Sequence, residues 1–507
     1  MSTVVRARTL ASLLVVAASC TPEATPPLEP LGPVVTEGVV DSKTEPRPTF
    51  GTLTVRIVGE RLHRLQTSRS ADGGMDRRFV VETLADAQCT WTYPPEGVPS
   101  GDEFLNDFTV HPSGEVSLTL QHLTSTRDAF EVLRFSAQGE LVERHTLSPG
   151  TLLPQSDRGD LPEPPFRMDS DWADDALSEG WIRVVANGED AVVAFQSHVD
   201  RSDGQFSLEV ASAVVWLVWA GGGYVETRAR TVDGRHGVGP AAWTYDEFRW
   251  RQAAVRPYLA LDPITGHVVV GRAWNKLRCD AAVEIFQEGT AFDCVFDSVS
   301  PIDNERLPFA WTSFAPDGTR EGTRVWMPAL TSEFVVFDMA VRDGLVAVVG
   351  AHVREDTEGT VVYYDGNLVP YDGYVALLDR ATGELRWERD VDGTGRGDVL
   401  STLRFVEDGV LAGGATDWDR WNGGMSISRG ADPWLVFVSL DGDAVQRSIP
   451  VDAPARHTHL LGVDVTEGPQ RRIVGAGLGD APMTHSGDGG QTAEMVFGDV
   501  LVTVAGP

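Results

Sequence analysis

The residue spacing in this chain that is best suited to chemistry begins at Asp390. Asp390, Asp392, Thr394 and Asp398 carry side-chain oxygens at positions 1, 3, 5 and 9, and Gly395 stands at position 6. Alternate residues of a tight turn can direct their oxygens at one centre, and glycine permits the bend, which is what a calcium loop requires. The segment is therefore a candidate calcium site. The alternative is a glycine-rich connection between two strands.

Two tryptophans form a candidate ligand site. Trp418 and Trp421 lie in a loop rich in aspartate and glycine, and Trp434 follows it. Aromatic rings in such a loop can stack on a sugar, so Trp418 and Trp421 are candidate ligand-binding residues. The alternative is that these tryptophans pack between neighbouring elements of the fold.

Two further groups have metal-ligating side chains but lack the features of a site. The acidic residues of 169–175 have no glycine among them, which favours a solvated loop. His457 and His459 lie two residues apart, with His485 farther on, and they have no nearby cysteine or suitable acidic third ligand. We expect surface histidines.

The sequence contains none of the common catalytic motifs. It lacks a Gly-x-Ser-x-Gly elbow, a His-Glu-x-x-His pair, a phosphate-binding loop and a dinucleotide fingerprint. Carboxylates are too numerous to single out a glycosidase pair. The expectation is a protein that is not an enzyme and that has no cofactor, with calcium as the only candidate ion.

Composition excludes two other classes of protein. The chain has 507 residues with 52 glycines and 30 prolines, which is too many breaks for a helical bundle or coiled coil. Its 74 acidic and 42 basic residues give a formal charge of -32. Because that charge repels a polyanion at long range, we expect no nucleic-acid partner.

The first 48 residues have the composition of an export signal followed by a tether. Arg6 and Arg8 precede an apolar run over 10–18, which is too short to span about 30 Å of hydrocarbon. Residues 20–48 are rich in proline and acidic residues, so they predict an extended segment that forms no core. We expect a signal peptide at 1–19, a tether at 20–48 and a folded domain at 49–507.

Ala17-Ala18-Ser19-Cys20 resembles the lipobox of bacterial lipoproteins. The resemblance implies that Cys20 is acylated, with palmitate among its acyl chains, and that the protein is exported to the bacterial cell envelope. Membrane contact would be through this lipid anchor alone, with the outer membrane as the expected location. An ordinary secreted protein cleaved near Ala18 is the alternative.

The other three cysteines are Cys89, Cys279 and Cys294. Cys279 and Cys294 flank a plausible hairpin, and in an oxidising compartment a disulfide there stabilises by about 3 kcal/mol. Cys89 is left over, and we expect a buried, inert thiol.

A repeating unit fills the folded domain. Its first half is two apolar strands around a turn that contains glycine. Copies begin at Phe108, Ile182, Tyr258, Phe337, Leu403 and Val463. The second half is another such hairpin, and copies begin at Phe130, Phe309, Tyr374 and Trp434. Two hairpins make a four-stranded antiparallel sheet, or blade.

Repeated short sheets must bury both faces, which a β-propeller achieves by packing each blade on its neighbours. The chain is therefore predicted to be all-β, a propeller of six to seven four-stranded antiparallel blades. A sandwich or a solenoid fits the period less well. The last copy reaches Pro507 before any outer hairpin, so the segment 49–65 is predicted to supply the missing outer strands of that copy and to close the ring as an N-terminal strand. Residues 67–103 leave a seventh blade undecided.

Tyr374–Asp417 resembles the repeats of quinoprotein-like and secreted bacterial propellers, and the segment from Asp390 resembles the calcium hairpin of integrin-type propellers. The first resemblance implies either a quinone-dependent dehydrogenase or a non-enzymatic lipoprotein that scaffolds envelope assembly. A dehydrogenase of this kind usually has adjacent cysteines, and this chain has none.

The function expected from these observations is that of a monomeric, membrane-anchored binding or scaffold module. Its partner would be an envelope protein or a polysaccharide, because a propeller holds its loops on a stable disc. The alternative is a quinoprotein-like oxidoreductase, or a hydrolase of envelope polysaccharide, with its site at the mouth of the propeller channel.

Overall fold

A computed structural model provides the coordinates, and the secondary structure of its described residues consists of strands. No helix among these residues is long and apolar enough to cross a membrane. The described residues are 51–69, 75–84, 88–95, 103–122, 129–148, 182–202, 206–232, 237–238, 257–273, 309–326, 334–353, 368–369, 371–391, 398–416, 420–421, 432–442, 444–448, 458–466, 472–480 and 497–505.

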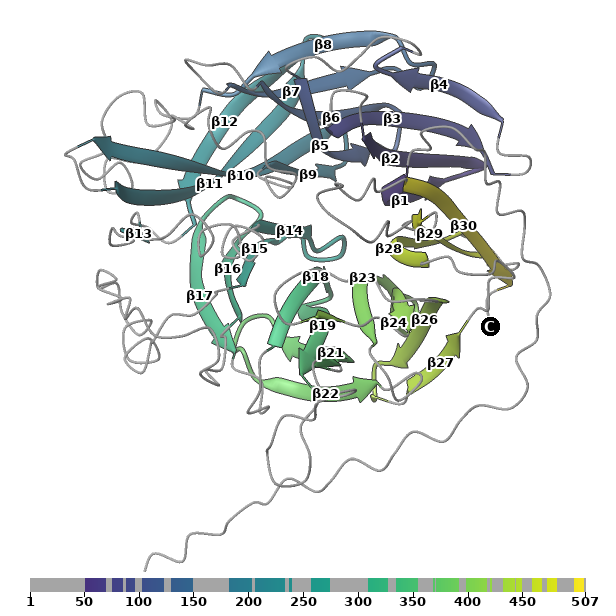
Figure 1. Cartoon of the computed structure of the whole chain (residues 1–507). Helices are drawn as coiled ribbons and strands as arrows, with labels where there is room; N and C mark the ends of the chain where they lie inside the picture. Colours follow the sequence, from purple (N-terminus) through teal and green to yellow (C-terminus); the bar gives the residue numbers. More distant parts are fainter. Residues whose placement is uncertain are drawn as a thin grey trace, which may run out of the picture.

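The described strands form seven antiparallel sheets around a common axis, as Figure 1 shows. We number the sheets in chain order. Sheet 1 contains β1 (Gly51–Val58), β2 (Arg61–Arg69), β3 (Met75–Thr83) and β4 (Cys89–Tyr93). Sheet 2 contains β5 (Glu103–Val110), β6 (Val116–His122), β7 (Ala129–Phe135) and β8 (Leu141–Thr146). Sheet 3 contains β9 (Ile182–Asn187), β10 (Asp190–Ser202), β11 (Phe206–Ala220) and β12 (Gly223–Thr231), and β13 (Gly237–Val238) pairs with β11.

The second half of the ring follows the same order. Sheet 4 contains β14 (Pro257–Leu261), β15 (Val268–Ala273), β16 (Phe309–Phe314) and β17 (Arg320–Trp326). Sheet 5 contains β18 (Phe334–Arg342), β19 (Leu345–Val353), β21 (Tyr371–Asp379) and β22 (Leu385–Val391). Sheet 6 contains β23 (Val399–Val406), β24 (Gly409–Thr416), β26 (Asp432–Ser439) and β27 (Ala444–Ser448). Sheet 7 contains β28 (Thr458–Val465), β29 (Arg472–Asp480) and β30 (Phe497–Ala505).

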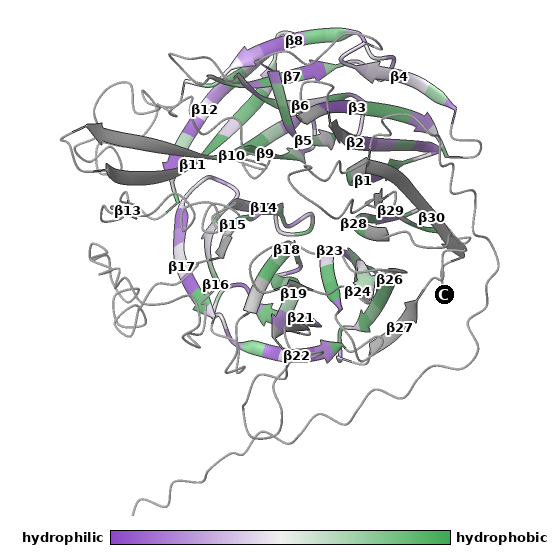
Figure 2. Cartoon of the chain, in the orientation of Figure 1, coloured by the Kyte–Doolittle hydropathy of each residue, from purple (hydrophilic) through white to green (hydrophobic). Residues whose placement is uncertain are grey.

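Each sheet buries apolar side chains against both of its neighbours. The seven apolar clusters of the core correspond to the seven junctions between adjacent sheets. In Figure 2, hydrophobic residues mark the inner strand β24, whereas hydrophilic residues dominate the outermost strand β12. The first strands of neighbouring sheets contact one another and so surround the axis. The burial of both faces is what makes these short sheets stable together.

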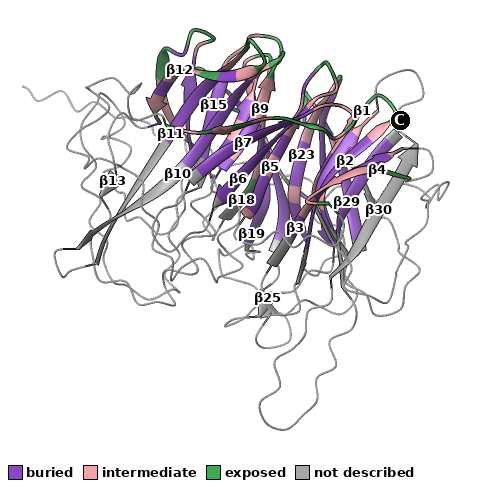
Figure 3. Cartoon of the chain, turned by 90° about the horizontal axis from the view of Figure 1, so that it is seen from above, coloured by how far each residue is buried: buried purple, intermediate pink, exposed green. Residues whose placement is uncertain are grey.

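The two ends of the ring differ. Within each sheet, the turns that join strands one and two, and strands three and four, lie on one face, which we call the turn face (Figure 3). Short turns such as 59–60, 221–222 and 343–344 are on this face. The remaining links start and end on the opposite face, which we call the connection face, and they include 147–181 and 274–308.

These sheets confirm the predicted fold class. Five sheets have four strands, sheet 3 has four and the short fifth strand β13, and the described part of the seventh has three, as the early end of its sequence copy indicates. Residues 67–103 provide strands β3 and β4, so a complete first sheet exists.

The N-terminal segment closes the ring in a different way from the one expected. Strand β1 pairs with β2 and not with a strand of the last sheet, because β3 and β4 complete its own sheet. It packs beside sheet 7 instead. A Cβ atom on Gly462 would lie 2.8 Å from the Val55 nitrogen, so glycine allows this close approach of the two backbones.

Candidate functional site

Six charged side chains, which we call the axial ring, come from the first strands of six sheets. The members are Arg56 on β1, Asp107 on β5, Arg183 on β9, Asp338 on β18, Arg404 on β23 and Asp464 on β28. Positive and negative charges alternate around the ring, because sheets 1, 3 and 6 provide arginine and sheets 2, 5 and 7 provide aspartate. Strand β14 of sheet 4 has no charged residue and interrupts the alternation.

The three aspartates perform the same structural task. The innermost strand of each sheet has one unpaired edge, so some of its backbone N–H groups need an acceptor. An aspartate of the preceding sheet provides it. The bonds run from Val184 N to Asp107 Oδ2 (3.1 Å), from Leu403 N to Asp338 Oδ2 (2.9 Å) and from Ile57 N to Asp464 Oδ2 (2.7 Å). Each aspartate therefore connects two adjacent sheets.

The arginines are paired to different extents. Arg404 Nε lies 3.1 Å from Asp464 Oδ1, whereas Arg183 Nη1 is 4.0 Å from Asp107 Oδ1. Arg56 donates from Nη1 to its neighbour, the Val55 carbonyl oxygen, at 2.9 Å. Burial lowers the pKa of Arg56 and the positive charge of Arg404 adds to this effect, while the aspartates of the ring oppose it.

The same surroundings act on the acids. Burial raises the pKa of Asp107, with Arg183 opposing the shift. Burial also raises the pKa of Asp338, and the N–H groups of Leu403 and Met339 oppose it. Charges here are poorly hydrated, so an opposite charge nearby has a larger effect than it would have at the outer surface.

Irregular pairing occurs close to these residues. Five first strands have a bulge-like register shift just before or near the ring residue. In β18 the shift falls between Val336 and Asp338, at Phe337. Phe337 is 38% exposed although neighbouring sheets cover both faces of sheet 5. Bulges commonly redirect side chains in this way.

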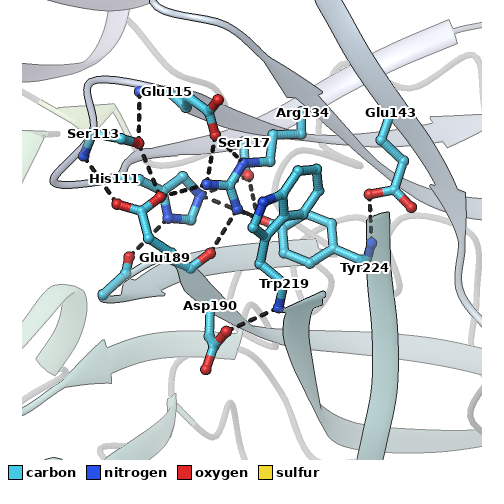
Figure 4. Close-up of polar contacts among 11 residues, drawn as sticks. His111, Ser113, Glu115, Ser117, Arg134, Glu143, Glu189, Asp190, Trp219 and Tyr224 are labelled. Carbon is cyan, nitrogen blue, oxygen red and sulfur yellow. Dashed lines mark hydrogen bonds and ion pairs between the residues drawn. The ribbon is translucent and has the colours of Figure 1, made fainter. Parts of the chain in front are cut away.

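A second polar cluster, shown in Figure 4, joins sheets 2 and 3 near the turn face. Its centre is Arg134 on β7, a fully buried side chain. Arg134 donates to Glu115 Oε2 from Nε (2.6 Å), to Glu189 Oε2 from Nη2 (2.6 Å) and to the Tyr224 hydroxyl from Nη1 (3.1 Å). Its guanidinium also lies 4.0 Å from the centre of the Trp219 ring. Burial alone would lower the pKa of Arg134, but Tyr224 and Glu115 raise it.

His111 and Ser117 stand beside this arginine in the geometry of a nucleophile and its base. The Ser117 hydroxyl is 2.8 Å from His111 Nε2, and His111 Nδ1 is 2.9 Å from the Gly188 carbonyl oxygen. That carbonyl can only accept, so Nδ1 carries the proton of the neutral ring. Burial lowers the pKa of His111, which keeps it neutral. Both side chains are buried from solvent, so the pair holds two sheets together and a substrate cannot reach it.

Asp262 makes a corresponding clip between sheets 4 and 5. Its carboxylate accepts from the backbone N–H groups of Asp343 (3.0 Å) and Gly344 (2.9 Å) in the neighbouring turn. Within its own turn it accepts from Ile264 N (3.0 Å) and from Thr265 Oγ1 (2.6 Å). Burial opposes ionisation, but these hydrogen bonds lower the pKa of Asp262 to about 2.

The structure places only part of the predicted calcium loop. Asp390 lies near the end of β22, with Oδ1 2.9 Å from His352 Nε2. Asp398 is fully buried just before β23. Asp392, Thr394 and Gly395 lie outside the described residues. The described residues include no group of three or more metal-ligating side chains. Calcium binding stays a prediction.

The tryptophans divide between two environments. Trp421 belongs to β25 (Arg420–Trp421), whose backbone pairs with Leu368 of β20 (Leu368–Val369). Trp418 lies outside the described residues. Trp434 is 1% exposed and packs between sheets 5 and 6, which bears out the packing interpretation for this residue. Sugar binding by Trp418 and Trp421 stays a prediction.

Most cysteine and histidine predictions fall outside the described residues. These positions are Cys20, Cys279, Cys294, His457 and His485, together with the acidic group 169–175. The expectation of a buried Cys89 is wrong. Cys89 is exposed, because it lies on β4, the outermost strand of sheet 1.

Sequence reasoning missed the axial ring, although a signal was present. The segments around Arg183 and Arg404 read IRVV and LRFV, and the segment at Asp338 reads FDMA. A single charge inside an apolar strand at the start of successive repeats conflicts with simple burial. That conflict marks the position at which the repeats meet.

Comparisons with known proteins identify no family for this chain. No family model matches the chain, and no curated protein matches it. Among solved structures, a quinohemoprotein alcohol dehydrogenase from Pseudomonas putida is 11% identical, covering 72% of this chain and 62% of its own, at a TM-score of 0.32. The polysaccharide lyase Uly1 is 9% identical, covering 90% of both chains, at 0.40. An α-L-arabinofuranosidase of Fusarium graminearum is 9% identical, covering 81% of this chain and 95% of its own, at 0.37.

These matches correct the expectation that the chain is not an enzyme. The solved structures that match are mostly enzymes. Their low identities and TM-scores assign no reaction to this chain.

Proposed function

We propose that the chain is an exported, lipid-anchored β-propeller that binds an envelope protein or polysaccharide through its connection face. The observation that carries the proposal is a projecting hairpin, which we call the arm, formed by residues 196–212 of β10 and β11. These parts of the two strands extend from the connection face.

The register defines the arm. Strand β9 pairs with β10 only as far as Phe195, and β12 pairs with β11 only as far as Ala213. Beyond these residues the two long strands pair with each other, from Gln196 with Ser212 to Ser202 with Phe206, and β13 adds a short third strand. At about 3.3 Å per residue the arm reaches about 20 Å beyond its sheet. A paired hairpin of this length presents backbone that lies outside the four-stranded part of the sheet.

The position of the expected anchor supports a partner at the envelope. Strand β1 starts at Gly51 and runs towards the turn 59–60, so the chain enters the ring at the connection face. A lipid on Cys20 would therefore be joined to the same face that carries the arm. An extended tether over 21–48 would have a reach on the order of 90 Å.

The described residues around the axis do not match the requirements of a quinone cofactor that is held by calcium. That cofactor needs a cluster of oxygen ligands for its ion. The axial ring alternates in sign instead of gathering its carboxylates, and the described residues contain no metal-ligating group of three. These residues do not fit the cofactor.

The test is a pair of variants made in the full chain. In the arm variant, residues 197–211 are replaced by a single Asn-Gly turn, and in the control variant Ile264, which is 59% exposed on the turn face, is replaced by serine. Each protein is used to retrieve material from envelope extract. We expect the arm variant to lose the material that the wild type and the control retain, at an unchanged melting temperature. Equal recovery by all three proteins contradicts the proposal.

A separate variant tests the anchor. Cys20→Ser should move the protein from the membrane fraction to the soluble fraction and should abolish labelling by palmitate. Retention in the membrane fraction without label would contradict lipid anchoring.

A further inference from the structure

We propose that the interruption of the axial ring at sheet 4 is a binding site for a small zwitterion. In this site Arg183 takes the anionic group of the ligand, Asp338 takes its cationic group, and Phe337 contacts its carbon skeleton. The proposal concerns the axis of the ring and is independent of partner binding at the connection face.

The order of the charged residues in the axial ring sets Arg183 and Asp338 apart from the other four members. Around the ring, Arg56, Asp107, Arg404 and Asp464 each have an oppositely charged residue on both neighbouring positions. Arg183 and Asp338 flank β14, whose sequence Pro-Tyr-Leu-Ala-Leu carries no charge. Each of these two residues therefore has an opposite neighbour on one side only.

Arg183 and Asp338 both retain the capacity to form further hydrogen bonds and ion pairs. The contact of Arg183 in the ring is the long one, 4.0 Å to Asp107, and its side chain is 27% exposed. Asp338 accepts from Met339 N and Leu403 N, both at 2.9 Å, and it forms no ion pair with any described residue. A carboxylate accepts about four hydrogen bonds, so half of this capacity remains.

The carboxylate of Asp338 is poorly hydrated. Burial opposes charge at Asp338, so a charge there without a counter-ion is costly. A cationic group of the ligand bound at Asp338 recovers part of that cost. At Arg183, the guanidinium can bind a carboxylate of the ligand through two parallel hydrogen bonds. A ligand with only one charge would satisfy one end of the site and leave the other unchanged.

The net charge of the chain and the side chain of Phe337 favour a ligand that has no net charge and has an apolar part. The chain carries a formal charge of -32, which disfavours the approach of an anion, whereas a zwitterion has no net charge. Phe337 precedes Asp338 on the innermost strand of sheet 5, and 38% of its surface is exposed. Methylene groups between the two charges of a ligand can pack against this ring.

The test is calorimetric titration of the full chain with ω-amino acids from glycine to 6-aminohexanoate. Butyrate and butylamine serve as singly charged analogues. We expect one chain length to bind, and both analogues to bind at least about tenfold more weakly, which corresponds to the loss of one charged contact. Absence of binding by every ω-amino acid overturns the proposal, and so does equal binding by the analogues.

Two variants separate binding from stability. Asp338→Asn removes the charge at the site, and Asp464→Asn is the matched control, because both aspartates accept from their own next residue and from a neighbouring sheet. We expect similar falls in melting temperature for both variants, with binding lost only in Asp338→Asn. Arg183→Gln should also abolish binding. An equal loss of affinity in the control would overturn the proposal.

Discussion

Two junctions on the turn face place different residues at the same position of the repeat. His111 and Asp262 each follow the first strand of a sheet, and each bonds to the corresponding turn of the next sheet. His111 donates a proton to the Gly188 carbonyl, whereas Asp262 accepts from the N–H groups of Asp343 and Gly344. The backbone of a turn offers both donors and acceptors, so either polarity can connect neighbouring sheets.

The two junctions also differ in the number of buried polar groups that they hold. Asp262 satisfies two turns by itself and has no buried counter-ion among its described contacts. The junction of His111 includes a buried guanidinium with two carboxylates, a hydroxyl and an aromatic ring around it. The junction that contains Arg134 is therefore more sensitive to substitution. If this buried charge is removed, all of its partners lose a hydrogen bond or an ion pair at once.

The largest expected effect is that of Arg134→Leu. It removes the charge while Glu115 and Glu189 keep theirs, and it removes the hydrogen bond that the Tyr224 hydroxyl accepts from Arg134. We expect a loss of about 3–5 kcal/mol in the free energy of unfolding, measured by urea denaturation. Arg228→Ala is the control, since its bond to the Pro316 carbonyl is exposed and 3.4 Å long. A loss below 1 kcal/mol for Arg134→Leu would show that the two sheets do not depend on this network.

Asp262→Ala should have the next largest effect. It leaves the Asp343 and Gly344 N–H groups at the junction without their acceptor, and it also removes the bond from Thr265. We expect a loss of about 2–3 kcal/mol, measured in the same way. Asp262→Asn keeps one acceptor and should lose less. If both variants are equally unstable, the carboxylate charge matters more than the number of bonds.

The pH dependence of stability distinguishes the two clips. The pKa of His111 is lowered in the folded state, so unfolding takes up a proton and stability falls as the pH decreases below about 6.5. The pKa of Asp262 is lowered to about 2, so its contribution persists until the pH falls below 3.8. Between pH 7.5 and 5.5 we expect the stability of His111→Gln to fall less than that of the wild type, by at most about 1.4 kcal/mol. His63, whose pKa burial lowers to about 4, accounts for a remaining slope.

An unchanged pH slope in His111→Gln would mean that its ring is charged in the folded protein. Asp262→Asn is the complementary control, because it should alter the pH dependence only below about pH 4.

The smallest effect is expected for Ser113→Ala. The Ser113 hydroxyl donates to Glu189 Oε2 at 2.9 Å, but this contact is exposed to solvent. We expect a change of at most about 0.5 kcal/mol, measured by urea denaturation beside Arg134→Leu. A larger loss would indicate that Glu189 needs both of its partners to hold Arg134.

Local patterns were sufficient to predict the hairpins and the incomplete last sheet. The turns DG at 343–344 and NG at 187–188 lie between apolar segments, and both form the expected hairpins. The N-terminal strand was assigned to the wrong partner because β3 and β4 have weaker repeat signals than the later copies. The axial ring was not predicted, since its members look like isolated surface charges until the first strands are brought together.

By itself, the sequence determined the alternation of short strands and tight turns, because the dihedral angles of a turn and the two-residue period of a strand are local properties. Only the tertiary structure decided which charges meet. Ile57 and Asp464 are 407 residues apart in the chain, yet their hydrogen bond joins the first sheet to the last. Such a contact depends on the number of sheets and on their packing angle around the axis, and no local pattern contains either quantity.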